Sequence, residues 1–259
     1  MALLNPTLFA EWIEPHSFEW YNQLGKQQGE YAYSWNSTIL KPNGEILFDE
    51  EVKKMIASKK VLDVGCGHGE FAIECSPIAK EIVGFDVTNL FIEQGKRKKP
   101  DNVSFVQGST KEELSFSEDE FDCAYIRKGP TSGYLALTQT VKKGGAVLGL
   151  HPGDDMDKEL PILFPNLFQA KLPRDSTLKA IQKRLKTANF DKWEIETVSN
   201  IEILHSPMDI INKRCFGQHP FVTEKIKNEN LNEITEIFGL HEMNGLPITN
   251  SYYIVRATV

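Results

Sequence analysis

Short apolar segments alternate with helical patterns from Lys60 to His151, and this alternation constrains the fold more than any other feature. The expected strands are Val61–Val64, Glu81–Asp86, Val103–Gln107, Phe121–Arg127 and Ala146–His151. Helical patterns are expected over 70–76, 90–97 and 134–141. Strands that alternate with helices are typical of a parallel sheet with helices on both faces. The mostly apolar strands fit burial on both sides, so the sequence predicts an α/β fold.

The regions outside this segment are less regular. Residues 1–45 are rich in aromatic side chains and are expected to form an N-terminal helical cap segment, while 46–259 form the main domain. Inserts are expected near 153–175, which carries several prolines, and near 206–248, which has a helical pattern. A helix over 177–188 and strands over 193–198 and 250–258 complete the main domain, the last as its closing strand.

Composition excludes several classes of protein. The chain has 259 residues, 25% charged residues and a formal net charge of −7, which argues against a partner held through many phosphates. Its four cysteines form no CxxC pair and no zinc-ligand pattern with histidines, so no metal site is expected. The N-terminus lacks the pattern of a signal peptide, and no apolar run approaches the length of a membrane span. A cytoplasmic location without membrane contact is therefore expected.

The first strand runs into a glycine loop with the sequence Asp63-Val64-Gly65-Cys66-Gly67-His68-Gly69. Glycine permits tight turns and close approach of a ligand, and the helix that follows offers free N–H groups. The dinucleotide fingerprint is G-x-G-x-x-G, whereas the spacing here is G-x-G-x-G. An acidic side chain at Asp63 would repel a pyrophosphate but would orient a cationic amine. The loop therefore favours a nucleotide-like ligand that carries an amine.

This loop resembles the first motif of class I S-adenosylmethionine-dependent methyltransferases. The resemblance implies a Rossmann-like sheet of seven strands, mostly parallel with an antiparallel closing strand. It also implies S-adenosyl-L-methionine as cofactor and S-adenosyl-L-homocysteine as product. Gly65, Cys66 and Gly67 would wrap the methionine part of the cofactor, and Asp63 would orient its ammonium group, usually through water.

Later motifs agree with the resemblance, which implies a role for each. Asp86 ends the second strand and would accept hydrogen bonds from the ribose hydroxyls, while Val87 would pack on the adenine. Gly108 and Ser109 follow the third strand and would line the adenine edge. The alternative for Asp86 is an aspartate that only shapes a turn before Thr88. The alternative for Ser109 is a cap of the next helix.

Two charged or titratable residues end later strands. Arg127 either binds a carboxylate, of the cofactor or of an anionic substrate, or forms an ion pair with Asp63, since an unpaired charge there would be costly. His151 either serves as a general base near neutral pH or is a satisfied structural histidine. The sequence after Arg127 lacks the Asn/Asp-Pro-Pro-aromatic motif of enzymes that methylate the amino groups of nucleic-acid bases.

The expected function is methyl transfer from S-adenosylmethionine. The acidic charge and the aromatic N-terminus favour a small-molecule acceptor over nucleic acid, in a pocket formed by the inserts and the N-terminal segment. An RNA methyltransferase is the first alternative, because a basic face need not show in the net charge. A protein that binds S-adenosylmethionine without catalysis is the second.

Overall fold

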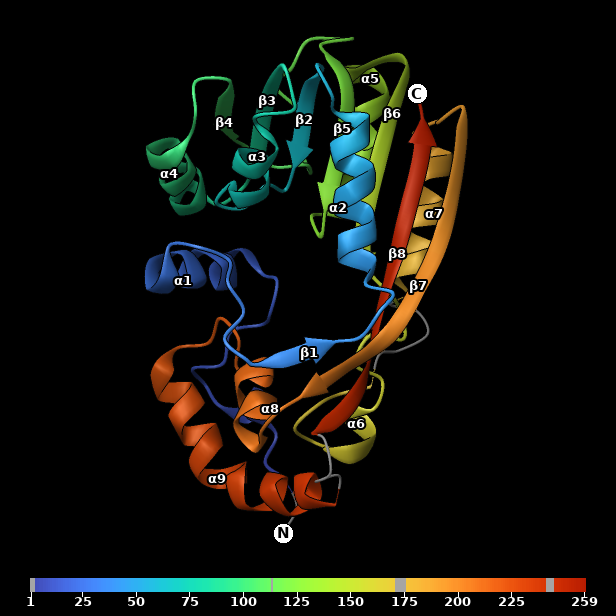
Figure 1. Ribbon diagram of the computed structural model, residues 1–259. Coiled ribbons are helices and arrows are strands. Elements are labelled where there is room, and N and C mark those ends of the chain that lie inside the picture. Colours follow the sequence, from blue (N-terminus) through green and yellow to red (C-terminus); the bar gives the residue numbers. More distant parts are fainter. Residues whose placement is uncertain (1–2, 113, 171–175, 241–244) are drawn as a thin grey trace. The chain divides into compact units, whose positions relative to one another are not determined.

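The computed structural model describes residues 3–112, 114–170, 176–240 and 245–259 (Figure 1). The chain forms two compact units. Unit 1 comprises Met1–Asn43, Asp155–Leu172 and Ser199–Ser251, and unit 2 comprises Gly44–Asp154, Pro173–Val198 and Tyr252–Val259. Unit 1 thus gathers most of the expected cap with most of the two expected inserts, while the expected domain boundaries themselves stay a prediction.

Eight strands of the described residues form one sheet, in the order β1-β7-β8-β6-β5-β2-β3-β4. Their bounds are β1 Ser37–Ile39, β2 Lys60–Val64, β3 Glu81–Asp86, β4 Val103–Gln107, β5 Phe121–Arg127, β6 Val141–Pro152, β7 Lys192–Leu204 and β8 Leu246–Thr258. Strands β4, β3, β2, β5 and β6 run parallel to one another, and β8 runs antiparallel to β6. This confirms the predicted α/β fold with an antiparallel closing strand.

The resemblance implied seven strands, and the additional one is β1. It has three residues and pairs antiparallel with residues 202–204 of β7. A segment this short carries too few residues to show the alternation from which strands are predicted. Strands β7 and β8 also exceed their expected bounds of 193–198 and 250–258, because each continues into unit 1.

Helices cover both faces of the sheet in unit 2. The described helices of this unit are α2 Gly44–Met55, α3 Glu70–Cys75, α4 Asn89–Lys98, α5 Tyr134–Thr140 and α7 Thr177–Thr187, together with the short 3-10 helix η2 Thr131–Gly133. Figure 1 shows α2 on one face of the sheet and α5 and α7 on the other. Side chains on a strand alternate between the two faces. Leu62 and Ala124 therefore pack into the core with α5 and α7, whereas Asp63 and Tyr125 face the opposite side.

The glycine pair Gly144-Gly145 lies within β6, although the strand was expected to begin only at Ala146. The register explains the discrepancy, because Phe121 pairs with Val141 whereas Cys123 pairs with Ala146. Asp122 of β5 thus lies opposite four residues of β6, 142–145, and the extra residues form an irregularity in the ladder. The glycines mark a bulge inside one strand instead of a boundary.

Unit 1 has a hydrophobic core of its own. Its helices are η1 Pro6–Leu8, α1 Phe18–Gln28, α6 Leu160–Leu163, α8 Pro207–Arg214 and α9 Pro220–Gly239. The α6 helix lies in the insert that was expected to be irregular, of which 171–175 fall outside the described residues. Trp20 is buried, and its indole N–H donates to the carbonyl of Phe216 at 3.0 Å. None of the described helices is both long and apolar enough to cross a membrane.

Replacement of Gly149 by alanine is expected to destabilise the protein by about 1–3 kcal/mol, because the core is close-packed there. A Cβ atom on this residue of β6 would lie 1.7 Å from the hydroxyl oxygen of Tyr134. Urea unfolding of Gly149→Ala measures the loss. The double variant Gly149→Ala/Tyr134→Phe removes the clashing oxygen and should recover part of it. An additive double variant would contradict this explanation.

Candidate functional site

The site lies at the carboxyl ends of β2, β3 and β5, where the strand order reverses. From β2 the chain moves outward to β3 and β4, then returns to β5 on the other side of β2. Ligands of open α/β sheets bind beside the strand ends at such a reversal. The loop after β2 and the segment after β5 meet here, because a Cβ on Gly65 would lie 2.6 Å from the Pro130 ring.

The glycines of the loop serve different purposes. All three have positive φ, at 78° for Gly65, 57° for Gly67 and 81° for Gly69. A Cβ on Gly69 would lie 2.1 Å from the Phe105 ring, so Gly65 and Gly69 are required by packing within the protein. Apart from Gly67 itself and its two neighbours in the chain, no described residue has an atom within 4 Å of the Cβ position of Gly67. Gly67 is therefore the glycine of the loop that borders open space.

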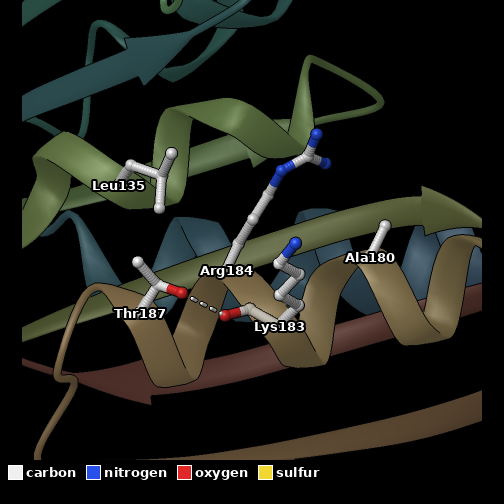
Figure 2. Close-up of a pocket in the computed structure, with 5 residues that line it drawn as sticks. All are labelled: Leu135, Ala180, Lys183, Arg184 and Thr187. Carbon is white, nitrogen blue, oxygen red and sulfur yellow. Dashed lines mark hydrogen bonds between the residues drawn. The ribbon is translucent and has the colours of Figure 1, made fainter.

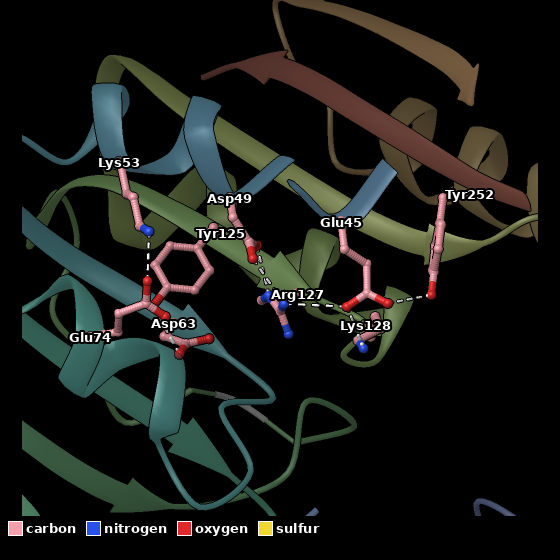
Figure 3. Close-up of polar contacts among 9 residues, drawn as sticks. All are labelled: Glu45, Asp49, Lys53, Asp63, Glu74, Tyr125, Arg127, Lys128 and Tyr252. Carbon is pink, nitrogen blue, oxygen red and sulfur yellow. Dashed lines mark hydrogen bonds and ion pairs between the residues drawn. The ribbon is translucent and has the colours of Figure 1, made fainter. Parts of the chain in front are cut away.

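Asp63 is a buried carboxylate with one oxygen satisfied (Figure 3). It is 2% exposed, and its register partner on β5 is Tyr125, whose hydroxyl donates to Oδ2 at 3.0 Å. Oδ1 is buried and has no hydrogen-bond partner among the residues that the structure describes. Burial raises the pKa of Asp63 to about 7, against the hydrogen bond from Tyr125 and the positive charge of Arg127. An unsatisfied buried oxygen of this kind requires an explanation.

Asp86 fastens the glycine loop to the end of β3. Its Oδ2 accepts the Gly67 N–H at 2.9 Å, and its Oδ1 accepts the Thr88 N–H at 2.8 Å. The second contact is the turn that the sequence analysis gave as the alternative role. Burial raises the pKa of Asp86 above its usual value, although these backbone hydrogen bonds lower it. Asp86 thus places the N–H of Gly67 and its own carboxylate side by side.

The remaining loop residues predicted to bind the cofactor surround the same strand ends. Cys66 is half-buried, and burial raises the pKa of its thiol well above its usual value. The carbonyl of Val87 accepts the side-chain amide of Gln107 at 3.3 Å. Gly108 donates its N–H to the Asp86 carbonyl at 3.0 Å. Ser109 Oγ accepts the Lys111 N–H at 3.2 Å, which is a local turn contact.

Arg127 is paired with helix α2, and not with Asp63 as one alternative had it. Its Nε and Nη2 donate to the two carboxylate oxygens of Asp49 at 2.8 and 2.9 Å, and Nη2 also lies 3.3 Å from Glu45 (Figure 3). The guanidinium lies over the Phe71 ring, 4.9 Å from its centroid. Its bidentate pairing with Asp49 favours a structural role, because a carboxylate ligand would have to displace this aspartate.

His151 is 1% exposed, and its Nε2 lies 2.9 Å from the Tyr134 hydroxyl. Burial and the positive charge of Arg184 lower the pKa of His151 to about 3, against a hydrogen bond with the Gly129 backbone. A histidine with so low a pKa is a weak proton acceptor at neutral pH. These observations favour the structural alternative over the general base.

The structure also contains a surface pocket away from the strand ends. Figure 2 shows it between α5 and α7, with Leu135 on α5 facing Ala180, Lys183, Arg184 and Thr187 on α7. Its volume is about 290 Å³. None of the residues predicted to bind the cofactor lines it. Within the described ranges, no group of three or more His, Cys, Asp or Glu side chains is arranged to hold a metal ion.

Three residues that contact Asp63, Arg127 or Lys128 were not predicted from the sequence: Tyr125 and the α2 carboxylates Glu45 and Asp49. Glu45 accepts hydrogen bonds from Lys128 at 2.8 Å and from the Tyr252 hydroxyl at 2.7 Å. Burial opposes ionisation of Glu45, but Lys128 and its other partners hold its pKa below the usual value. The available signals were the i,i+4 spacing of the two carboxylates and the i,i+2 spacing of Tyr125 and Arg127, since each spacing places two residues on one face.

Asp63→Asn is expected to remove a pH dependence from the stability of the protein. The carboxyl has a folded-state pKa of about 7 and an ordinary value of 3.8. Because the folded value is raised, its stabilising contribution is complete below about pH 4 and is lost as the pH rises through 7. Between about pH 5 and 8, wild type should lose on the order of 2–3 kcal/mol relative to the variant. Urea unfolding across this range measures the difference, and parallel curves would contradict the assignment.

Comparison with known proteins finds a methyltransferase domain within part of the chain. A family model for the methyltransferase domain matches residues 61–143, which include the glycine loop, Asp86 and Arg127. Over 109 residues the chain is 34% identical to the uncharacterized methyltransferase YcgJ of Bacillus subtilis (strain 168). This alignment covers 36% of the chain and 43% of YcgJ, so the matched segment spans less than half of that relative.

Solved structures share the fold. The YcgJ structure superposes with a TM-score of 0.56 at 19% identity, covering 82% of this chain and 98% of that one. A functionally unknown protein from Deinococcus radiodurans R1 gives 0.60 at 17% identity, with 93% and 97% covered. Phosphoethanolamine N-methyltransferase 2 of Haemonchus contortus, bound to phosphomonomethylethanolamine and S-adenosylhomocysteine, gives 0.50 at 14%, with 84% and 52% covered. Residues 61–143 thus match a methyltransferase domain, and the chain shares the fold of these solved structures.

Proposed function

We propose that the protein transfers a methyl group from S-adenosylmethionine to a small-molecule acceptor. The observation that carries the proposal is the buried Oδ1 of Asp63, which has no partner among the described residues and lies directly before the glycine loop. A cationic ligand would supply the missing partner, since opposite charge and hydrogen bonding both favour an ionised carboxylate.

The residues at the strand ends fit the methionine part of this cofactor. Its ammonium group would interact with Asp63 Oδ1, through water where the oxygen itself is enclosed. Gly67 has open space on the side where other residues carry Cβ, so a ligand can approach its backbone closely. Gly65 and Cys66 complete the loop; the amides of both donate to the Phe85 carbonyl, at 2.7 and 3.2 Å, which fixes the loop on β3.

The adenosine part would bind at the end of β3. The Asp86 carboxylate would accept hydrogen bonds from the ribose hydroxyls, because an ionised carboxylate has several acceptor sites and its two present contacts use one per oxygen. Val87 would pack on the adenine, with Gly108 and Ser109 along its edge. Asp86 would therefore bind the ribose and hold the Gly67 backbone in place at the same time.

When bound, the cofactor supplies a methyl group already activated by a positively charged sulfur. The protein's task is to hold the acceptor in line with that group and to keep water away. We assign Arg127 to the positioning of helix α2, because its charge is matched by Asp49 and Glu45. We assign His151 no role as a base, because it is buried and its pKa is about 3.

The formal net charge of −7 supports a small-molecule acceptor, because proteins that bind RNA rely on Lys and Arg to contact phosphates. The charges around the strand ends point the same way. Arg127 and Lys128 are both paired with the carboxylates of α2, so this part of unit 2 offers little free positive charge to a phosphate backbone.

Asp86→Ala is expected to weaken the affinity for S-adenosylhomocysteine at least about 10-fold, because the ribose loses its acceptor and the Gly67 amide loses its tie. Isothermal titration of wild type and variant measures this. Asp101→Ala is the matched control, since it removes the same charge from an exposed position of unit 2 and should bind like wild type. Equal affinity of all three proteins would refute the ribose assignment, and a wild type that binds neither S-adenosylmethionine nor S-adenosylhomocysteine would refute the proposed function.

RNA is expected not to be retained by the protein on a filter at about 150 mM salt, because phosphate binding requires clustered positive charge. The measurement uses total RNA over a range of salt concentrations. Retention that falls steeply with salt would overturn the small-molecule assignment and favour an RNA methyltransferase.

A further inference from the structure

We propose that Tyr125 is a positioning residue of the cofactor site: its hydroxyl holds Oδ2 of Asp63, keeps the carboxylate charged, and directs Oδ1 to the ammonium group of the cofactor. This inference rests on the proposed function. It assigns a role to a residue of β5 that otherwise looks like part of the apolar core.

The register of the sheet creates the contact. Asp63 on β2 and Tyr125 on β5 are direct partners in a parallel pair, so their side chains emerge on the same face. Tyr125 is fully buried, and its ring packs edge-on against Phe71 at a centroid distance of 5.6 Å. This packing orients the ring, so that the hydroxyl reaches Oδ2 at 3.0 Å.

The chemistry of the pair fixes the direction of the hydrogen bond. Burial and the negative charge of Asp63 raise the pKa of Tyr125 well above its usual value, so the hydroxyl keeps its proton and donates it. A phenylalanine would fill the same volume without burying a polar atom that must be satisfied. The hydroxyl is therefore the part of this side chain that packing does not explain.

The charges around Asp63 show why a neutral donor matters. From β5 the Arg127 guanidinium favours the carboxylate, but Asp49 and Glu45 on α2 largely neutralise it. After β3, Asp86 disfavours the charge. The thiols of Cys66 in the loop and Cys75 on α3 also face the carboxyl and keep their protons, since burial raises the pKa of both. Among the groups that lower the pKa of Asp63 against the effect of burial, the Tyr125 hydroxyl has the largest influence.

The test is the pH dependence of S-adenosylhomocysteine binding by Tyr125→Phe. The ratio of variant to wild-type Kd cancels the titration of the ligand's own amine. Relative to wild type, the variant should bind about five-fold more weakly at about pH 7 and within about two-fold at about pH 9, where Asp63 is charged in both proteins. Tyr134→Phe is the matched control, because it removes another fully buried hydroxyl, one that contacts His151 and not Asp63.

A ratio that stays constant between these pH values would overturn the proposal, because a merely structural loss weakens binding equally at every pH. A second measurement needs no ligand. The ¹³C resonance of the Asp63 carboxyl, assigned with Asp63→Asn, should titrate at higher pH in Tyr125→Phe than in wild type. An unchanged midpoint would also overturn the role of Tyr125, whereas a shifted midpoint without cofactor binding would refute the proposed function alone.

Discussion

One carboxylate is buried in the centre of the sheet, and the candidate site is arranged around it. Asp63 is the fourth residue of β2, which lies between β3 and β5. A buried carboxylate costs free energy unless hydrogen bonds or opposite charges satisfy it. The structure provides one hydrogen bond, from Tyr125, and leaves the other oxygen without a described partner. This incomplete satisfaction distinguishes Asp63 from the carboxylate of a structural ion pair, and it occurs where the strand order reverses.

The second constraint is the close approach of two loops at that reversal. A Cβ on Gly65 would lie 2.6 Å from the Pro130 ring, and a Cβ on Gly129 would lie 2.4 Å from the Val64 carbonyl oxygen. These glycines are therefore needed to bring the loop after β2 onto the segment after β5. With that contact made, Gly67 is left at the open side of the loop, and Asp86 holds its amide. The packing of Gly65 thus leaves Gly67 beside open space, where a ligand could approach it.

The sequence predicted the strands that carry the site, because their apolar runs and the intervening helical patterns are regular. It also marked Asp63 and Asp86 as candidate site residues, since a carboxylate next to a glycine loop or at a strand end interrupts an apolar pattern. Tyr125 could not be predicted in the same way. A tyrosine in an apolar strand is normal core composition, and its contact with Asp63 depends on a register between β2 and β5 that no local pattern contains. Likewise Asp49 and Glu45 have the spacing of an ordinary solvated helix face.

The pairing of Arg127 with these α2 carboxylates has a consequence for how the site discriminates charge. A free guanidinium beside Asp63 would neutralise the carboxylate and reduce its attraction for an ammonium group. Asp49 accepts hydrogen bonds from Nε and Nη2 of this guanidinium, and Glu45 forms ion pairs with both Arg127 and Lys128. The positive charges at the end of β5 are therefore matched by α2, while Asp63 and Asp86 have no cation paired with them among the described residues. When ionised, these two carboxylates favour a positively charged ligand, which agrees with the sulfonium and ammonium groups of the proposed cofactor.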